Sequence, residues 1–274
     1  MKKIFKSIVN VFWRKSRWQG FFEALHFFSL RGMNFGGGSY PKDSGERYTI
    51  QSSLFKLGSL PTSGDSPWIF FDVGANKGDY TEELLGQLSA AKHNFVIYSF
   101  EPSVAAYAQL TEKFAREKNV KIFNFGFSDS AGSQTLFSDA AGSGLGSLLP
   151  RDIRHTGSSF SHSETVTVAT LDDFCHRENI SAIDFLKLDV EGAEYRVLSG
   201  AKELLQSGKI RFLQFEFGGA DIDARLYFRD FFYLLEPRYH IYRILKDGLR
   251  PVTHYREQDE IFITTNYLAE LKSL

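Results

Sequence analysis

The sequence has a single cysteine, Cys175, so the chain cannot form an internal disulfide. It also lacks any cluster of cysteine and histidine with the spacing of zinc ligands. The sequence contains no run of about 20 apolar residues, which is the length needed to cross a bilayer. The N-terminal tip is basic, but Lys6 and then Arg14 leave an apolar run that is too short for a signal peptide. These absences predict a cytoplasmic protein in a reducing compartment.

A strong charge of either sign is also missing. The 274 residues contain 32 Lys and Arg against 33 Asp and Glu, which gives a net charge of −1. Without a domain-wide positive potential, we expect no nucleic-acid partner. The hydrophobic content of 43% can bury a large core, so the sequence predicts one large domain with or without an extension.

The N-terminal segment differs from the rest of the chain. Residues 1–30, with Arg31 directly after them, carry aromatic residues at mostly helical spacing and seven Lys and Arg against one acid, Glu23. This pattern predicts a basic amphipathic helix. Its apolar stripe could pack on the main domain or a partner subunit, or the helix could lie on an anionic membrane, at its inner face. Because the Gly-rich stretch "GMNFGGGSYPKDSG" predicts a link, we expect an extension and linker at 1–45 and a domain at 46–274.

From Trp68 onward, β-type runs alternate with helical patterns. This alternation predicts an α/β fold with a mostly parallel sheet and helices on both faces. The expected strands are 68–73, 95–100, 120–125, 183–188, 210–217, 239–245 and 260–265, and the expected helices are 78–88, 104–118, 191–206 and 226–235. The last two strands are expected to pair antiparallel at one edge. The Gly/Ser-rich segment 139–164 predicts a lid or a disordered excursion between short strands at 135–137 and 165–168.

Ligands of such sheets bind at the carboxyl ends of the strands. There the first strand is followed by "DVGANKG", in which Gly74 and Gly78 permit a tight turn and a close backbone approach. Asn76 and Asp79 occupy positions where a dinucleotide-binding G-x-G-x-x-G motif needs glycine, and no G-x-x-x-x-G-K-[ST] motif is present. A nicotinamide-dependent oxidoreductase and a nucleotide triphosphatase are therefore both disfavoured.

Acidic residues mark the ends of the following strands. Glu101 in "YSFEPS" has two acceptor oxygens, which suit the two ribose hydroxyls of an adenosine. Ser128 and Asp129 in "FNFGFSD" come after the third strand, where a carboxylate could accept an adenine amino group. Asp189 and Glu216 end the fourth and fifth strands. The glycine-rich turn after the first strand, Glu101 after the second and Asp129 after the third together favour an adenosine-containing cofactor.

Five segments together resemble the FkbM family of S-adenosylmethionine-dependent methyltransferases, over Gly45 to Thr265. They are "FFDVGANKGDYT", "FEP", "FGFSD", "TLDDF" and "IDFLKLDVEGAEYRVLSGA". The resemblance implies a class I methyltransferase fold: a doubly wound, Rossmann-like, mostly parallel seven-stranded sheet with one antiparallel edge strand. It further implies O-methylation of a hydroxyl on a sugar, a glycan or a secondary metabolite such as a polyketide.

The resemblance also implies a role for each strand end. Glu101 would hold the ribose of S-adenosylmethionine, and Ser128 and Asp129 its adenine. The amino-acid end of the cofactor would lie against Asp72, Gly74, Asn76 and Gly78.

Methyl transfer is an in-line displacement that also requires removal of the hydroxyl proton. Asp189 and Glu216 are the candidate catalytic residues. Either a carboxylate acts as general base, or the two bind a divalent cation, Mg²⁺ or Mn²⁺. Glu191 and Glu194 are typical of acids near a helix N-terminus.

Other functions and roles stay open at this point. His155 or His162 could supply a base from segment 139–164, and Arg151 or Arg154 could meet an anionic acceptor. An NAD-dependent oxidoreductase and a non-catalytic relative that binds a partner through its N-terminal helix are the alternative functions. The sequence does not predict the oligomeric state.

Overall fold

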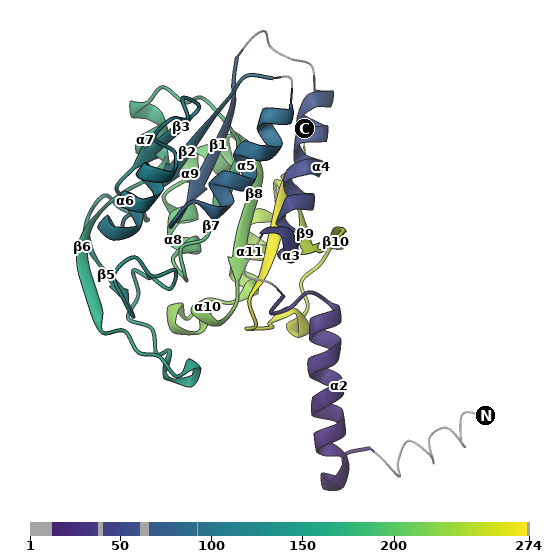
Figure 1. Cartoon of the computed structure of the whole chain (residues 1–274). Helices are drawn as coiled ribbons and strands as arrows, with labels where there is room; N and C mark the ends of the chain where they lie inside the picture. The colour runs from purple at the N-terminus through teal and green to yellow at the C-terminus, as the bar shows by residue number, and fades with distance from the viewer. Residues whose placement is uncertain (1–12, 38–40, 61–65, 92, 273–274) are drawn as a thin grey trace.

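A computed structural model describes residues 13–37, 41–60, 66–91 and 93–272. Its centre is an eight-stranded sheet in the order β10-β9-β11-β8-β7-β1-β2-β3 (Figure 1). The strands are β1 (Trp68–Val73), β2 (Phe95–Phe100), β3 (Val120–Phe123), β7 (Ile183–Leu188), β8 (Ile210–Phe217), β9 (Tyr239–Leu245), β10 (Gly248–Val252) and β11 (Thr265–Leu271).

The strand directions confirm the predicted fold class. Neighbours from β3 to β8 are parallel, whereas β11 is antiparallel to both β8 and β9, and β10 is antiparallel to β9. The sheet therefore has eight strands, not the seven expected. The antiparallel strand β11 lies inside the sheet, and the edge strand β10 is antiparallel as well.

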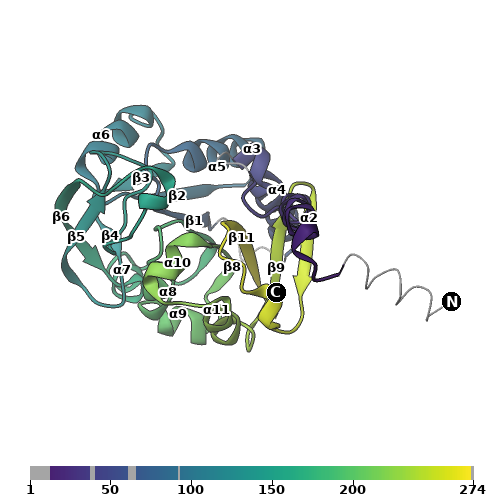
Figure 2. The ribbon, with the colours of Figure 1, turned by 90° about the horizontal axis from the view of Figure 1, so that it is seen from below.

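Helices cover both faces of the sheet. Figure 2 shows α4, α5 and α6 on one face and α7, α8, α9 and α11 on the other. Their bounds are α4 (Glu46–Ser59), α5 (Asp79–Ala90), α6 (Val104–Lys113), α7 (Leu171–Arg177), α8 (Glu194–Ser199), α9 (Lys202–Gln206) and α11 (Phe228–Leu235). The short helices α3 (Pro41–Ser44) and α10 (Gly219–Ala224) precede α4 and α11.

Strand β1 shows how the two hydrophobic cores form. Successive side chains of a strand point to opposite faces. Phe70 accordingly packs in the cluster of α4 and α5 with Ile50 and Leu84, whereas Phe71 belongs to the cluster on the other face with Phe174 of α7. Full burial of each such side chain contributes about 1.5–3 kcal/mol, so the carboxyl end of β1 is held from both sides.

Three further strands form a small second sheet beside β3, in the order β4-β6-β5. They are β4 (Gly126–Phe127), β5 (Gly132–Ser138) and β6 (His162–Ala169). The segment between β5 and β6 folds back on β5, where Phe137 and Ser147 exchange backbone hydrogen bonds of 2.8 and 2.9 Å.

The described part of the N-terminal extension is helical, as predicted. A turn of 3-10 helix (Ser16–Trp18) leads into α2 (Gln19–Gly32), which projects away from the rest of the molecule in Figure 1. Residues 1–12 of the predicted helix lie outside the described residues. Within the described ranges, no helix is both long and apolar enough to cross a bilayer.

Three element predictions differ from the structure by more than three residues, and one of them is the helix expected at 104–118, which ends at Lys113. The last strand spans Thr265–Leu271, not 260–265, because pairing with β8 and β9 outweighs the helical preference of Ala269, Glu270 and Leu271. The single helix expected at 191–206 is two helices that break at Gly200. A side chain at Gly200 would come within 2.2 Å of the Ser128 carbonyl oxygen, so the chain turns where the backbones approach.

Candidate active site

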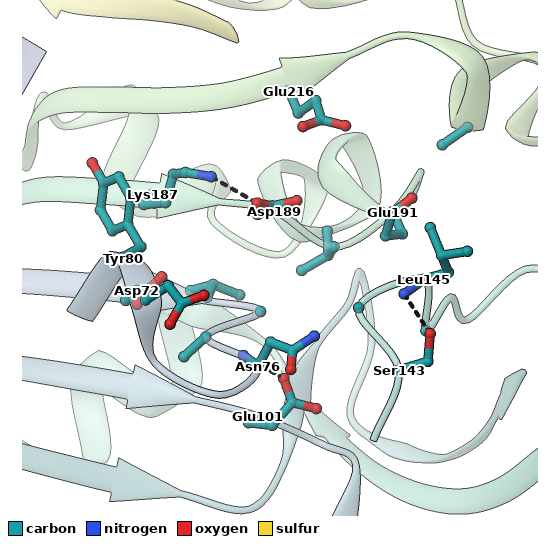
Figure 3. A pocket seen from close by; sticks show the side chains of 18 of the residues that line it. Asp72, Asn76, Tyr80, Glu101, Ser143, Leu145, Lys187, Asp189, Glu191 and Glu216 are labelled. Carbon is teal, nitrogen blue, oxygen red and sulfur yellow. Dashed lines mark hydrogen bonds and ion pairs between the residues drawn. The ribbon is translucent and has the colours of Figure 1, made fainter. Parts of the chain in front are cut away.

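A cavity of about 700 Å³ lies at the carboxyl ends of β1, β2, β7 and β8. Asp72 and Glu101 line it from β1 and β2, which we call the β1–β2 side. Asp189, Glu191 and Glu216 line it from β7 and β8, which we call the β7–β8 side. Figure 3 shows the two groups facing the same space, with Asn76 and Glu101 across from Asp189 and Glu216.

The turn after β1 brings the two sides together. Gly74 has a φ of 84°, and its amide and that of Ala75 both donate to the Phe100 carbonyl at 3.0 Å. A Cβ on Gly74 would stand 1.8 Å from the Asp189 carbonyl oxygen. Only glycine fits here, because the backbone needs a left-handed conformation and the end of β7 passes directly beside it.

Glu101 is anchored at this turn by backbone amides. Its Oε2 accepts from the Asn76 amide and its Oε1 from the Ser103 amide, both at 2.8 Å. Burial raises the pKa of Glu101 to about 7, although these two hydrogen bonds favour the ionised form. Asn76 lies beside it, and its buried Oδ1 has no hydrogen-bond partner in the described part of the chain.

Asp72 is more deeply placed than Glu101. It is buried and accepts a hydrogen bond of 2.6 Å from the Thr81 hydroxyl of α5. Burial raises its pKa to about 6, and the Thr81 hydrogen bond acts in the opposite direction. The carboxylate still borders the cavity, as expected of a group that reaches the amino-acid end of a cofactor.

Ser128 and Asp129 do not line the cavity, whereas Gly126 and Phe127 just before them do. The Asp129 carboxylate instead lies 3.2 Å from Arg196 of α8, and this hydrogen bond lowers the pKa of Asp129. The adenine contact expected of these two residues stays a prediction.

The β7–β8 side is a cluster of three carboxylates. One oxygen each of Asp189, Glu191 and Glu216 lies within 4.8 Å of the others. Burial, and then the charges of Asp189 and Glu191, raise the pKa of Glu216 well above its usual range. In the described part of the chain, no group donates a hydrogen bond to the Glu216 carboxylate.

Glu191 was expected only as an acid at a helix start, but it lies in the cavity. Its φ of 52° is unusual for a residue with a side chain and costs about 1 kcal/mol. Glu194 holds this bend by accepting from the amides of Val190 and Gly192, both at 2.9 Å. Helix α8 begins only at Glu194, so the two glutamates have separate roles.

A buried lysine lies beneath the carboxylate cluster. Lys187 of β7 contacts Asp189 at 2.9 Å and Glu46 of α4 at 3.3 Å. Burial acts to lower the pKa of Lys187, but these two carboxylates outweigh it and keep the lysine charged. Gln214 of β8 extends the network by donating to Glu46 at 2.6 Å and accepting from the Tyr80 hydroxyl at 3.0 Å.

Segment 139–164 contributes one wall of the cavity. Ser147 donates to the Glu191 carbonyl at 2.7 Å, and Arg151 forms an ion pair with the Glu191 carboxylate. Arg151 lines the cavity, but Arg154 is exposed and pairs with Asp152. His155 and His162 do not line it. Neither histidine is therefore placed as a base.

The methyltransferase FkbM domain family matches residues 72–241. The chain belongs to the FkbM family. Membership confirms the predicted family and implies S-adenosylmethionine as the methyl donor. It also decides against the NAD-dependent oxidoreductase.

Similar proteins include the 2-O-methyltransferase NoeI of Sinorhizobium fredii, 26% identical over 163 residues. That match covers 56% of this FkbM chain and 65% of NoeI, just under two thirds of the relative.

Solved structures give more distant likenesses to this FkbM chain. Methyltransferase FkbM of Methylobacillus flagellatus KT is 19% identical with a TM-score of 0.45, and the match covers 80% of this chain and 47% of that one. SMU.1697c of Streptococcus mutans, in complex with SAH, is 12% identical with a TM-score of 0.42, covering 81% and 97%. Likenesses this distant carry no argument about the acceptor.

Sequence reasoning missed the cavity position of Glu191 and the contact of Glu46, and it named Arg151 as a contact for the acceptor, not as the ion-pair partner of Glu191. Glu191 was hidden because a helix was expected to begin there. Arg151 lies in a segment without regular spacing. Glu46 lies more than a hundred residues before its partner Lys187, and only the folded structure joins them. Acids flanking a glycine after a strand, as in "DVEGAE", were the one local signal for Glu191.

Proposed function

We propose that this chain is an S-adenosylmethionine-dependent O-methyltransferase that acts on a hydroxyl of a sugar, glycan or secondary-metabolite acceptor. The observation that carries the proposal is the cavity at the carboxyl ends of the strands, in which Glu101 faces the carboxylates of Asp189 and Glu216. The similarity to NoeI, a 2-O-methyltransferase, supports O-methylation among the possible methyl transfers.

The β1–β2 side fits the donor. Each Glu101 oxygen accepts one amide and keeps a lone pair for a ribose hydroxyl. Asn76 Oδ1 has no partner among the described residues and needs a donor, which the amino group of a bound cofactor would provide. Asp72, 1% exposed, adds a negative charge near that ammonium group. S-Adenosylmethionine supplies an electrophilic methyl group on a positively charged sulfur.

The β7–β8 side fits the removal of a proton. A general base works best when its pKa is near the operating pH. Glu216 has a raised pKa, and its carboxylate has no hydrogen-bond donor in the described ranges, so it suits this role. Asp189 is held by Lys187 and is better placed to orient the acceptor hydroxyl toward Glu216.

A divalent cation is the second candidate on this side. The three carboxylates of Asp189, Glu191 and Glu216 offer oxygen ligands that suit Mg²⁺ or Mn²⁺. Such a cation would make the acceptor hydroxyl more acidic. Lys187 and Arg151 already offset part of the negative charge, which favours the base over the cation. Turnover that survives EDTA would exclude a required cation. Turnover that EDTA abolishes and that only Mg²⁺ or Mn²⁺ restores would establish one.

Calorimetric titration with S-adenosylmethionine tests the proposal, with NAD as the competing ligand. We expect saturable donor binding that Glu101→Ala weakens about 10- to 100-fold, because hydrogen bonds to a charged group contribute about 1.5–3 kcal/mol. The matched control is Glu82→Ala, an exposed acid of α5 outside the cavity lining. Binding of NAD alone, or of neither ligand, would contradict the proposal; the second result would favour a non-catalytic relative.

A panel of acceptors then tests the reaction. Sugars, oligosaccharides and phenolic metabolites are incubated with enzyme and donor, and products are searched by mass spectrometry for one added methyl group. Methylation at nitrogen or carbon without any at oxygen would contradict the O-methyltransferase.

A further inference from the structure

Helix α2 carries large apolar side chains that the domain does not cover. Phe21, Leu25 and Phe28 follow the i, i+4, i+7 spacing that places residues on one helix face. Phe21 is 59% exposed and Phe28 is 76% exposed. This row, which we call the apolar stripe, argues against the expectation that the aromatic residues pack on the main domain.

The apolar stripe faces away from the domain. Leu30 is the one buried residue within α2, and at 100° per residue it points opposite to Leu25 and Phe28. The chain is then fixed just after the helix. Phe35 is buried, and the Asn34 side chain donates to the Ser44 carbonyl at 2.8 Å. The helix is therefore held at its C-terminal end and projects from the domain (Figure 1), with the exposed stripe on the face opposite Leu30.

Positive charge accompanies this stripe. Residues 13–37 hold four basic side chains, Arg14, Lys15, Arg17 and Arg31, against one acid, Glu23. Residues 1–37 contain seven Lys and Arg and that single acid, so the remaining 237 residues carry a net charge of −7 within a chain total of −1. The extension therefore has a net positive charge, although the rest of the chain has a net negative one.

We infer that α2 docks onto an anionic lipid surface. Exposed aromatic side chains next to Arg and Lys are the pattern of a helix that lies in a membrane interface. An anionic headgroup layer attracts each nearby cation, and the apolar stripe gains by leaving water. A second copy of α2 fits less well, because two strongly basic segments would repel each other.

The cavity would then lie beside the lipid. Asn34, Gly36 and Gly37 directly follow α2 and line the cavity, so docking of the helix brings this rim to the surface. An acceptor sugar carried on a lipid could then reach Asp189 and Glu216 without leaving the membrane. This last step rests on the proposed function, whereas the docking does not.

Sedimentation of the full chain with lipid vesicles tests the docking. One vesicle set is phosphatidylcholine alone, and the other is equal parts phosphatidylcholine and phosphatidylglycerol. We expect at least about tenfold more bound protein on the anionic vesicles, because several cations lie near their surface. Equal binding to both sets, or binding to neither, would overturn the inference.

Two substitution pairs test the apolar stripe. Phe21→Ser with Phe28→Ser should weaken binding to anionic vesicles at least about tenfold. The matched control is Phe55→Ser with Tyr233→Ser, which removes aromatic side chains 78% and 57% exposed elsewhere on the surface. A control that loses as much binding as the stripe variant would refute α2 as the docking surface.

A charge variant tests the cations. Arg14→Gln with Lys15→Gln and Arg17→Gln should remove most of the preference for anionic vesicles. Arg116→Gln with Lys118→Gln and Lys202→Gln removes three exposed cations elsewhere and should keep it.

Donor titration of each variant separates docking from folding and from catalysis. We expect unchanged S-adenosylmethionine affinity, or unchanged thermal unfolding if no donor binds. Light scattering tests whether the stripe binds a second copy of the chain. If the protein is a dimer that Phe21→Ser with Phe28→Ser dissociates, and if it does not bind vesicles, the stripe is a dimer contact and the inference is overturned.

Discussion

The two sides of the cavity hold their carboxylates in different ways. On the β1–β2 side, Glu101 accepts hydrogen bonds from two backbone amides, and Asp72 accepts one from a buried hydroxyl. Each acid therefore has its own fixed donors. On the β7–β8 side, Asp189, Glu191 and Glu216 crowd within 4.8 Å, balanced by Lys187 and Arg151. Fixed single acids suit recognition of hydroxyl and amino groups, whereas mutually repelling acids suit proton transfer or a cation.

The comparison is most sharply tested by turnover. Asp189→Ala and Glu216→Gln should each lower turnover about 10²–10⁴-fold, the range expected for loss of a positioned acid–base group. Donor affinity should stay within about twofold, because neither residue is assigned to the donor. Acceptor methylation and donor titration measure the two effects. The control is Glu112→Gln, an exposed acid of α6. If Asp189→Ala keeps full activity, the division between the two sides is wrong.

The next largest effect concerns the turn that joins the two sides. Gly74→Ala should lower the free energy of unfolding by about 3 kcal/mol or more, because its Cβ would meet the Asp189 carbonyl at 1.8 Å in a left-handed backbone. Gly86→Ala is the matched control, since no atom lies within 4 Å of its Cβ. In helix α5 it should stabilise the protein by about 0.5–1 kcal/mol. Urea unfolding measures both, and similar free energies for the two variants would show that the turn is not constrained.

The smallest effect is a dependence on pH. Burial raises the pKa of Glu101 from 4.5 to about 7, so the unliganded folded state binds more protons than the unfolded state between these values. Its contribution to stability is therefore present below pH 4.5 and is lost as the pH rises through 7. Donor affinity should change in the opposite direction, because two ribose hydroxyls require the ionised carboxylate.

One pH unit below the pKa, ionisation costs about 1.4 kcal/mol. Donor binding at pH 6 should therefore be about tenfold weaker than at pH 8. Glu101→Gln should flatten this dependence, as calorimetry at the two pH values would measure. An equally steep dependence in the variant would assign the titration to another group, such as Asp72.

The sequence predicts the β1–β2 side better than the β7–β8 side, for a physical reason. Gly74, Asn76 and Glu101 follow their strands directly, and a short turn after a strand has few conformations. Asp189 and Glu216 are also strand ends and were found in the same way. Glu191 and Arg151 meet through the fold of a long segment, which leaves no periodic pattern to read.

The same limit applies to the sheet. Parallel strands with buried residues on both faces were predicted from local hydrophobic runs. The insertion of β11 between β8 and β9 depends on pairing between segments about fifty and twenty residues apart. Local sequence could not place it inside the sheet.

The network around Lys187 also sets the smallest piece of this chain that could work as an enzyme. The family match ends at residue 241 and begins at residue 72, yet Glu46 precedes it and Asn266, 3.2 Å from Gln214, follows it. A fragment cut to the match would lose β11 from the middle of the sheet. It would also remove Glu46, so that Asp189 would be the one remaining ion-pair partner of Lys187 among the described residues. The catalytic domain is therefore longer than the segment that matches the family. It is complete only with the residues before residue 72, which include Glu46, and those after residue 241, which include β11.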